Sequence, residues 1–413
     1  MIEQPRKAAV TFIFITVVLD VLSLSIIIPV LPILIQDGFL QGNSTSAAHW
    51  VGVFGTVWAL MQFICSPIMG ALSDQFGRRR ILLLSCMGLG LDYILMALSP
   101  NLYWLFAGRI LSGIFAASFA TAAAYIADVT PPEKRAASYG MFGAAWGLGF
   151  VLGPVVGGTL ALYDQRLPFW VAAALTLLNA AYGYFILPES LPQQNRRKFS
   201  WTRANPLGSL RLLRSHPDLL GLASIMFLYQ LAHQVLSSIF VLYAKNRYSW
   251  DEQSVGCSLA AVGIAGVIVQ GGLVRPVAGK MNERKMLFIG LLFGATGYFI
   301  YGTAQTGYWF LTAIPVFAFV GFFSPAIQGL MTRRVQVNEQ GQLQGANSSM
   351  MGIAGMTGPL LFTFLYTPEF QGAPFIVAGC LHILAIIVAW CIVPNSSPKF
   401  ENSAPASESV ATG

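Results

Sequence analysis

The chain has 413 residues, of which 55% are hydrophobic and only 10% are charged, and its mean hydropathy is +0.64. Soluble domains carry about 25% charged residues, so this composition excludes a water-soluble globular protein and makes lipid the solvent for most of the chain. The net charge of +7 does not indicate a nucleic-acid partner, because the basic residues stand in short segments between apolar runs.

Twelve apolar segments are long enough to cross a membrane, which takes about 20 residues. In chain order they cover residues 8–35, 48–72, 80–98, 102–126, 137–161, 167–187, 217–244, 253–275, 285–304, 308–331, 343–366 and 372–393. The sequence therefore predicts an all-α membrane protein with twelve transmembrane helices.

The longest polar stretch between these helices covers residues 188–216. We therefore expect a six-helix bundle at 1–187, a cytoplasmic linker at 188–216 and a second six-helix bundle at 217–393. The Ser-, Ala- and Pro-rich tail at 394–413 is predicted to be disordered. A single offset aligns the halves, and it lays Tyr103-Trp104 on Tyr308-Trp309 and Gly153-Pro154 on Gly358-Pro359. Two related six-helix halves indicate a transporter whose site lies near the midplane between them.

The basic residues give the orientation. Of the 24 Lys and Arg residues, all except Arg109, Arg166, Lys245 and Arg247 fall on one side of the membrane when the helices alternate. Cytoplasmic loops carry the excess of Lys and Arg, so both termini are predicted to be cytoplasmic.

Asp20 lies near the midplane of the first predicted helix. An ionisable residue at this depth costs about 2.5–3.5 kcal/mol on insertion scales and calls for a reason. Asp20 either binds a proton or meets a cationic substrate, or it is a structural hydrogen-bond partner for a neighbouring helix.

Asp92 and Arg109 fall at similar depth in the consecutive predicted helices 80–98 and 102–126. This placement predicts an ion pair between them. The pair is either structural, since breaking it leaves a buried charge uncompensated, or a switch that protonation of Asp92 opens. Asp20, Asp92 and Arg109 are the candidate proton-coupling residues.

The loop after the second predicted helix contains Gly70, Asp74 and Gly77, followed by three arginines from Arg78 to Arg80. A stop signal for membrane insertion explains the arginines alone. It does not explain the spacing of the glycines and Asp74. Asp74 is expected to pair with an arginine or with a helix N-terminus.

The fifth predicted helix carries Gly149, Gly153, Pro154 and Gly157. Small residues four apart let helices approach closely, and a proline bends a helix. The pattern indicates either ordinary membrane packing or a helix that rocks against its neighbours.

Several polar residues of the predicted helices are candidates for lining a substrate cavity: Gln62, Tyr229, Gln230, His233, Gln328 and Asn347. Asn179 is a further candidate of this kind. Periodicity alone does not fix which of them face inward. No acidic residue lies within a helix of the second half, and His233 is either a proton site or a hydrogen-bonded interior histidine.

Together these motifs resemble the major facilitator superfamily, its twelve-helix drug/proton antiporters and, within them, the tetracycline exporters. The segment from Gly70 to Arg80 is similar to the cytoplasmic loop signature of the superfamily. Arg109 with Gly113 resembles the helix motif tied to proton coupling, and the segment from Gly149 to Gly158 resembles the antiporter motif, which implies export rather than uptake. Asp20 and the segment 128–135 are similar to the tetracycline group.

The resemblance implies a cytoplasmic gate formed by Asp74, Arg78 and Asp128, with Gly70 and Gly77 in its loop, which stabilises the outward-facing state. The chain also departs from the pattern. Classical tetracycline exporters carry a histidine and an aspartate in two helices of the second half, where this chain has Gly266 and Gly294.

The expected function is export of an amphiphilic, tetracycline-like drug in exchange for protons by alternating access, in a bacterial inner membrane and as a monomer. The alternative is proton-coupled uptake or export of a small metabolite or sugar. No nucleotide-binding loop or catalytic constellation is present, so neither an enzyme nor a cofactor is expected. The five cysteines, Cys86 among them, show no metal-ligand spacing and are interpreted as apolar packing residues.

Overall fold

A computed structural model describes residues 3–116, 118–131, 135–201, 205–206, 208–210, 212–213, 217–278, 280–336 and 339–393. Every element in these ranges is a helix, which confirms the predicted all-α class. The membrane helices of the first half are α1 (Glu3–Ile26), α3 (Ser44–Phe76), α4 (Arg78–Ala97), α5 (Leu102–Phe115), α6 (Ser118–Val129), α7 (Arg135–Ala161) and α8 (Leu167–Ile186). Those of the second half are α10 (Pro217–Tyr248), α11 (Glu252–Val267), α13 (Glu283–Thr303), α14 (Gly307–Ala318), α15 (Phe323–Thr332), α16 (Gln340–Phe364) and α17 (Ala373–Ile392).

Ten helical segments of the described chain are long and apolar enough to cross a membrane. The two remaining predicted helices are also helical. Residues 102–126 are divided between α5 and α6, and residues 343–366 fall in α16, whose first turns carry Gln340, Gln342 and Gln344 and are therefore less apolar. The arrangement is consistent with twelve transmembrane helices.

Short irregular pieces interrupt three of the predicted helices. The first ends at Ile26 and resumes after a turn as α2 (Leu31–Ile33) and the π-helix η1 (Leu34–Phe39), because the prolines at 29 and 32 lack the N–H groups that would continue it. The π-helix η5 (Ile268–Val274) and α12 (Arg275–Ala278) extend α11. The 3-10 turn η6 (Phe319–Phe322) joins α14 to α15.

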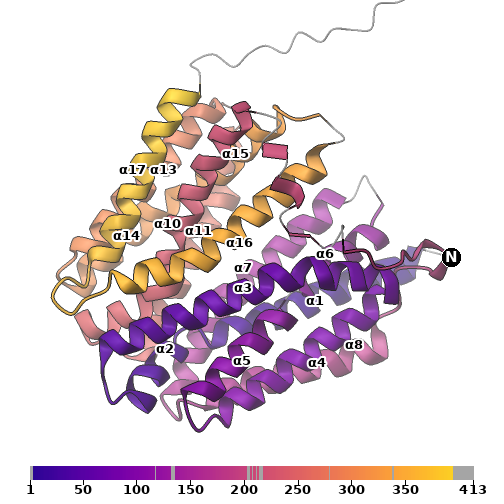
Figure 1. Cartoon of the computed structure of the whole chain (residues 1–413), viewed down its shortest axis with the longest axis horizontal. Helices are drawn as coiled ribbons and strands as arrows, with labels where there is room; N and C mark the ends of the chain where they lie inside the picture. The colour runs from indigo at the N-terminus through magenta and orange to yellow at the C-terminus, as the bar shows by residue number, and fades with distance from the viewer. Residues whose placement is uncertain are drawn as a thin grey trace, which may run out of the picture.

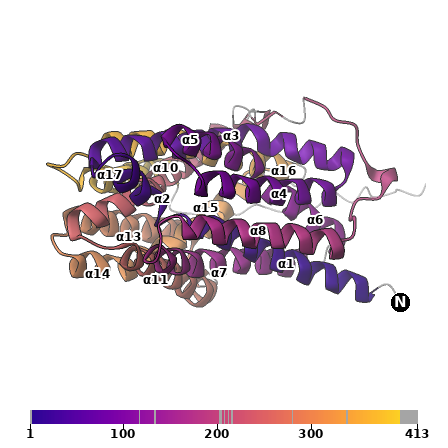
Figure 2. The same cartoon turned by 90° about the horizontal axis from the view of Figure 1, so that it is seen from below.

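The helices gather in two bundles, with α1–α8 in one and α10–α17 in the other (Figure 1). In the first bundle α1 packs along α7, and α4 packs along α8. In the second, α10 packs against α16 and α17, and α13 packs against α17. The bundles meet where α3 lies along α16 and where α7 lies along α11, as the view from below also shows (Figure 2).

The two bundles diverge toward the end at which α1 begins and α17 ends, here called the terminal end, and converge at the opposite end (Figure 1). Helices α7 and α11 show this directly. At the opposite end a side chain on Gly158 would strike the backbone of Glu252, and one on Gly256 would strike the backbone of Pro154. Farther along α7, a Cβ on Gly147 would lie 3.6 Å from Val267, and one on Gly143 would meet nothing within 4 Å.

The outer surface is apolar and carries exposed aromatic rings, as expected of a protein in contact with lipid. The repeated pairs Tyr103-Trp104 and Tyr308-Trp309 open α5 and α14, and Tyr103 and Tyr308 are 74% and 86% exposed. Exposed tyrosine and tryptophan rings at helix ends are typical of the interface between membrane and water. The two halves therefore present equivalent rings at the same level.

The chain between the bundles is fastened to both of them. On the first bundle, the Phe199 N–H donates to the Gln75 side chain at 3.1 Å, and the Arg197 N–H donates to the Asp74 carbonyl, also at 3.1 Å. On the second, the Ser349 hydroxyl donates to the Pro206 carbonyl. These contacts place the start of the linker beside the turn between α3 and α4.

Candidate functional site

Asp20 lies in α1 and is only 7% exposed, at the meeting point of three helices. The side-chain amide of Asn179 in α8 donates to its Oδ1 at 2.9 Å. The thiol of Cys86 in α4 lies 3.7 and 3.9 Å from the two carboxylate oxygens. Both partners are neutral donors, so within the part of the chain that the structure describes Asp20 is a buried carboxylate without an ion-pair partner.

These partners correct two interpretations made from the sequence. Cys86 contacts the Asp20 carboxylate and is more than an apolar packing residue. Asn179 is only 1% exposed and also donates to the Thr16 carbonyl at 3.2 Å, so it does not line an open cavity. Neither contact has a signal in the local sequence, because both depend on how three helices are rotated about their axes.

Asp92 and Arg109 lie on the neighbouring helices α4 and α5, but the predicted ion pair between them is wrong. Neither oxygen of the buried Asp92 carboxylate has a hydrogen-bond partner among the described residues. Its Oδ1 lies against Gly108, where a side chain would approach it to 2.9 Å. The Arg109 guanidinium instead lies 5.6 Å from the centre of the Trp58 ring. The two residues lie on neighbouring helices as predicted, but no ion pair joins them among the described residues.

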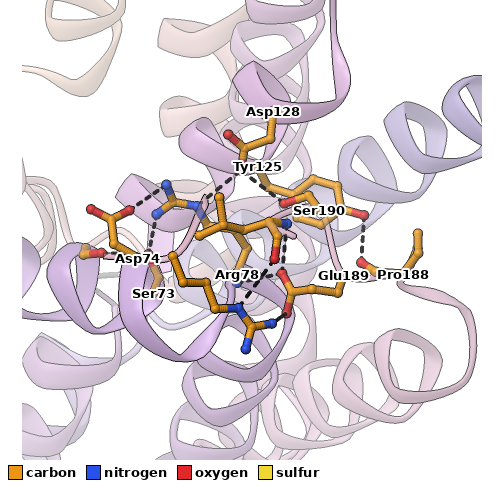
Figure 3. Close-up of polar contacts among 11 residues, drawn as sticks. Ser73, Asp74, Arg78, Tyr125, Asp128, Pro188, Glu189 and Ser190 are labelled. Atoms are coloured by element: carbon orange, nitrogen blue, oxygen red, sulfur yellow. Dashed lines mark hydrogen bonds and ion pairs between the residues drawn. The ribbon is translucent and has the colours of Figure 1, made fainter. Parts of the chain in front are cut away.

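Arg78 is the centre of a polar cluster at the terminal end (Figure 3). Its guanidinium contacts Asp74 at 2.6 Å and Asp128 at 3.2 Å, and it also donates to the Ser73 hydroxyl. The sequence spacing of Asp74 and Arg78 puts them one helical turn apart, and α6 ends where Asp128 can reach the same guanidinium. The three residues of the predicted gate therefore lie in contact.

The linker completes this Arg78 cluster, which consists of Ser73, Asp74, Arg78, Asp128, Glu189 and Ser190. The Arg78 N–H, at the start of α4, donates to Glu189 at 2.9 Å, and the Ser190 hydroxyl donates to Asp128 at 3.1 Å (Figure 3). Arg196 approaches Glu189 at 3.7 Å. Glu189 and Ser190 were not predicted as site residues, because in the sequence they look like the start of a polar connector. The only signal was a carboxylate and a hydroxyl directly after the sixth predicted helix.

The two glycines of the loop differ in their surroundings. Gly77 has a φ of +101°, a conformation that favours glycine, and the space that a side chain would occupy is taken by the Glu189 carboxylate. A Cβ on Gly70 would meet nothing within 4 Å. Gly77 is therefore required by the geometry of the cluster, whereas packing gives no reason for a glycine at position 70.

The small residues of α7 form a surface on which two helices rest. Side chains added at Gly149, Gly153 and Gly157 would strike α1 at Val21, Ser25 and Ile26. The Ser25 hydroxyl donates to the Gly149 carbonyl at 2.7 Å, which fastens α1 to α7. Pro154 lies inside α7, and its carbonyl is the nearest atom to Gly256 of α11. The motif thus serves close packing within the first bundle and between the bundles.

The candidate cavity residues fall into two separate groups. Tyr229 and His233 of α10 stack with ring centres 5.7 Å apart, and Tyr229 also stacks on Phe323 at 3.8 Å. Gln328 accepts at 3.4 Å from the amide of Asn347, which is buried between α15 and α16. Gln62 and Gln230 are half-buried and belong to neither group. His382 of α17 was not predicted; it is fully buried beside this group, with its ring 5.6 Å from that of Tyr229.

A polar latch joins the two bundles at the opposite end. The amides of Gln36 and Asn246 pair reciprocally, at 2.8 and 3.3 Å, and Asn246 also donates to the Tyr366 hydroxyl at 3.2 Å. Asp37 and Lys245 form an ion pair beside them. Gln36 and Asp37 belong to η1 and the other residues to the second bundle, so this Gln36 latch holds the bundles together where they converge.

Comparison with known proteins agrees with this architecture. The sequence profile of the Major Facilitator Superfamily matches residues 13–322 and 273–412. The chain is 36% identical over 374 residues to the class C tetracycline resistance protein of Escherichia coli, covering 90% of this chain and 93% of the relative. It is 32% identical over 407 residues to the class H tetracycline resistance protein of Pasteurella multocida, covering 97% and 100%.

Among solved structures, the fold is similar to that of the human organic anion transporter TETRAN. The TM-score is 0.70 at 23% identity, covering 94% of this chain and 100% of that one. Helix count, paired bundles, sequence profile and relatives lead to one assignment: the chain belongs to the Major Facilitator Superfamily, as a multi-pass membrane transporter related to the tetracycline resistance proteins.

Proposed function

We propose that the chain exports a tetracycline-like amphiphilic drug in exchange for protons, by alternating access between the two bundles. The substrate class is supported by the relatives, which are named for tetracycline resistance and match over nine-tenths of this chain. The antiporter motif of α7, which packs against both α1 and α11, supports export.

Asp20 is the observation that carries proton exchange. A carboxylate deep in a membrane protein is costly unless it is paired with a cation, and among the described residues the Asp20 carboxylate accepts hydrogen bonds from Asn179 and Cys86, both neutral. Taking up a proton removes that buried charge, and releasing it restores the charge. A group of this kind can link proton movement to a change in the packing of α1, α4 and α8. Asp92, which is also buried and has no hydrogen-bond partner among the described residues, is the second candidate, and Arg109 lies on the helix next to it.

The conformation supports alternating access. With the terminal end toward the cytoplasm, as the basic loops predict, the bundles converge on the outside and diverge on the inside. Export then requires the Gln36 latch to open and the terminal ends to approach. The two six-helix units are proposed to move as bodies within a single chain in the bacterial inner membrane. The stabilisation of the outward-facing state by Asp74, Arg78 and Asp128 stays a prediction.

The test uses proteoliposomes with the purified protein, an imposed pH difference and a pH-sensitive dye inside. Tetracycline and a panel of cationic drugs are added to wild type, to Asp20→Asn and to the control Asp164→Asn, which changes an exposed loop carboxylate. We expect drug-dependent proton movement in wild type and in the control, and its loss in Asp20→Asn, with drug exchange in the absence of a pH difference retained. If no drug moves protons through the wild type, the proposal fails and metabolite transport takes its place.

A further inference from the structure

Two of the four histidines of the chain pack against one ring inside the second bundle. His233 of α10 stacks on Tyr229 at 5.7 Å, and the edge of His382 of α17 meets the same ring at 5.6 Å. The acidic residues of this half stand at helix ends or in loops, from Asp218 to Glu369. The two imidazoles are therefore the titratable groups within the helices of this half that can change charge near neutral pH.

His382 is fully buried, yet only one of its two ring nitrogens is in a hydrogen bond within the described protein. Its Nδ1 lies 3.2 Å from the Ala378 carbonyl, one turn earlier in α17, and its Nε2 has no hydrogen-bond partner in the described protein. A neutral imidazole that donates through Nδ1 keeps a lone pair on Nε2. A buried polar atom left unpaired costs about 1–3 kcal/mol. A histidine that served packing alone would be replaced at lower cost by an apolar ring.

The surroundings of Nε2 can accept a positive charge. Gly294 of α13 lies against it, so that a Cβ there would approach Nε2 to 3.0 Å. The ring of Tyr298 lies 5.1 Å from that of His382, and its hydroxyl also has no hydrogen-bond partner. Aromatic rings attract a cation by about 0.5–2 kcal/mol, and the Ala378 carbonyl would continue to accept from Nδ1. No bonded neighbour competes for the lone pair.

Among the described residues of the helices packed on α17, the ionisable side chains in ring contact with His382 are Tyr229 from α10 and Tyr298 from α13, and His233 stacks on Tyr229. On α13, the charged Arg284 side chain lies over Trp390, about two turns away from His382 along α17. No carboxylate in the described chain faces the ring to hold a proton there permanently. A proton bound to His382 can therefore be released again.

His233 is the exposed member of this pair. Its ring stacks on Tyr229 and, at 6.0 Å, on Phe317, and α10 is in contact with α3, α11, α15, α16 and α17, so His233 lies among helices. Both imidazoles pack on the Tyr229 ring, so a charge on His233 lies close to His382. Because two neighbouring imidazolium ions repel each other, the pair would hold one proton rather than two.

We infer that His382 and His233 form a second proton-binding site, which binds one proton at a time and releases it during the transport cycle. The proton adds to the Nε2 lone pair of His382, with Nδ1 still bonded to Ala378, and it arrives from water through the exposed His233. This inference rests on the proposed proton exchange and adds a coupled proton beyond the one assigned to Asp20.

The transport experiment compares wild type, His382→Gln and the control His49→Gln, which removes an exposed histidine outside the site. Proteoliposomes are made acidic inside by about one pH unit, so each proton exchanged per drug supports about a tenfold drug gradient. We expect His382→Gln to lower the steady accumulation by about tenfold, equivalent to one lost proton, with drug counterflow at equal pH unchanged. Equal accumulation in His382→Gln and wild type would overturn the inference.

The outcomes separate this inference from the proposed function. Absence of drug-dependent proton movement in wild type defeats the proposed function itself. Proton movement in wild type with an unchanged proton-to-drug ratio in His382→Gln defeats only the second site.

If His382→Gln does not fold, nitrogen NMR of wild-type protein labelled at its histidines tests whether His382 binds a proton. The four histidine signals are assigned with single substitutions at positions 49, 216 and 233. We expect the His233 and His382 signals to change together as the pH is lowered through the range in which these histidines take up a proton, with a total uptake of one proton. A His382 signal that stays constant through this range would refute the site.

Discussion

The two ends of the molecule use polar residues in different ways. At the terminal end, the partners of Arg78 all belong to the first bundle or to the linker docked on it. At the opposite end, the Gln36 latch and the backbone contact of Gly158 with Glu252 join one bundle to the other. The Arg78 cluster therefore fixes the shape of one bundle in this conformation, whereas the contacts at the opposite end oppose a change of conformation.

Among the variants that test this difference between the two ends, Gly158→Ala is expected to have the largest effect on conformation and transport. The new methyl group would overlap the Glu252 backbone, and overpacking of this kind costs about 1–3 kcal/mol. Because only the convergent state contains the contact, the bundles should shift toward opening at the opposite end, with loss of drug transport. Distances between spin labels on α7 and α11 measure the shift.

Gly143→Ala is the matched control, since it places the same methyl group on the same helix in open space. We expect it to keep wild-type distances and transport. Identical distances and transport in the two variants would show that the close contact of α7 with α11 does not hold the bundles in the convergent conformation.

Arg78→Ala is expected to have an intermediate effect of another kind. It leaves Asp74 and Asp128 side by side without their common cation, and hydrogen bonds to charged groups are worth about 1.5–3 kcal/mol each. Partial exposure of both acids reduces the loss to about 2 kcal/mol in total. The variant should lower the thermal stability in detergent and leave the label distance at the opposite end unchanged.

Arg78→Lys tests geometry against charge. Lysine keeps the charge but not the planar group that reaches two carboxylates, so we expect partial recovery of stability. A shift of the label distance at the opposite end by either Arg78 variant would erase the distinction between the two ends.

The smallest expected effect concerns pH at the opposite end, where Asp251 caps the start of α11. Hydrogen bonds from the Ser254 hydroxyl and from its backbone N–H, which donates at 2.9 Å, hold the pKa of Asp251 below its usual value of 3.8. The charged carboxylate of Asp251 therefore stabilises the folded protein at pH values above the pKa that Asp251 has in the unfolded chain. This stabilisation is lost as the pH falls through the lower pKa of the folded protein.

Thermal unfolding between pH 6 and pH 3 measures this cap. Asp251→Asn keeps a capping oxygen and should show a smaller loss of stability on acidification than wild type. Asp251→Ala should cost about 1 kcal/mol at neutral pH, the usual value of an N-cap. Parallel pH curves for wild type and Asp251→Asn would show that another group dominates acid unfolding.

The sequence predicted what depends on one helix at a time. Twelve helices follow from apolar runs, the depth of Asp20 follows from counting residues along α1, and the one-turn spacing of Asp74 and Arg78 places them together. Contacts between helices depend on rotation about each axis, which a single sequence does not show. That is why the Asp92–Arg109 ion pair was wrong and why Asn179 and Cys86 were not recognised as partners of Asp20. Glu189 was missed because tertiary contact, not local pattern, places the linker against α4.

The connector between the bundles also limits how far they can travel. Phe199 is bound to Gln75 of the first bundle, and Pro206 is bound by Ser349 of the second. A fully extended chain covers at most about 3.5 Å per residue, so these two anchor points cannot separate by more than about 25 Å while both bonds hold. The connector therefore limits how far the bundles can separate at the terminal end. It does not oppose their approach at that end.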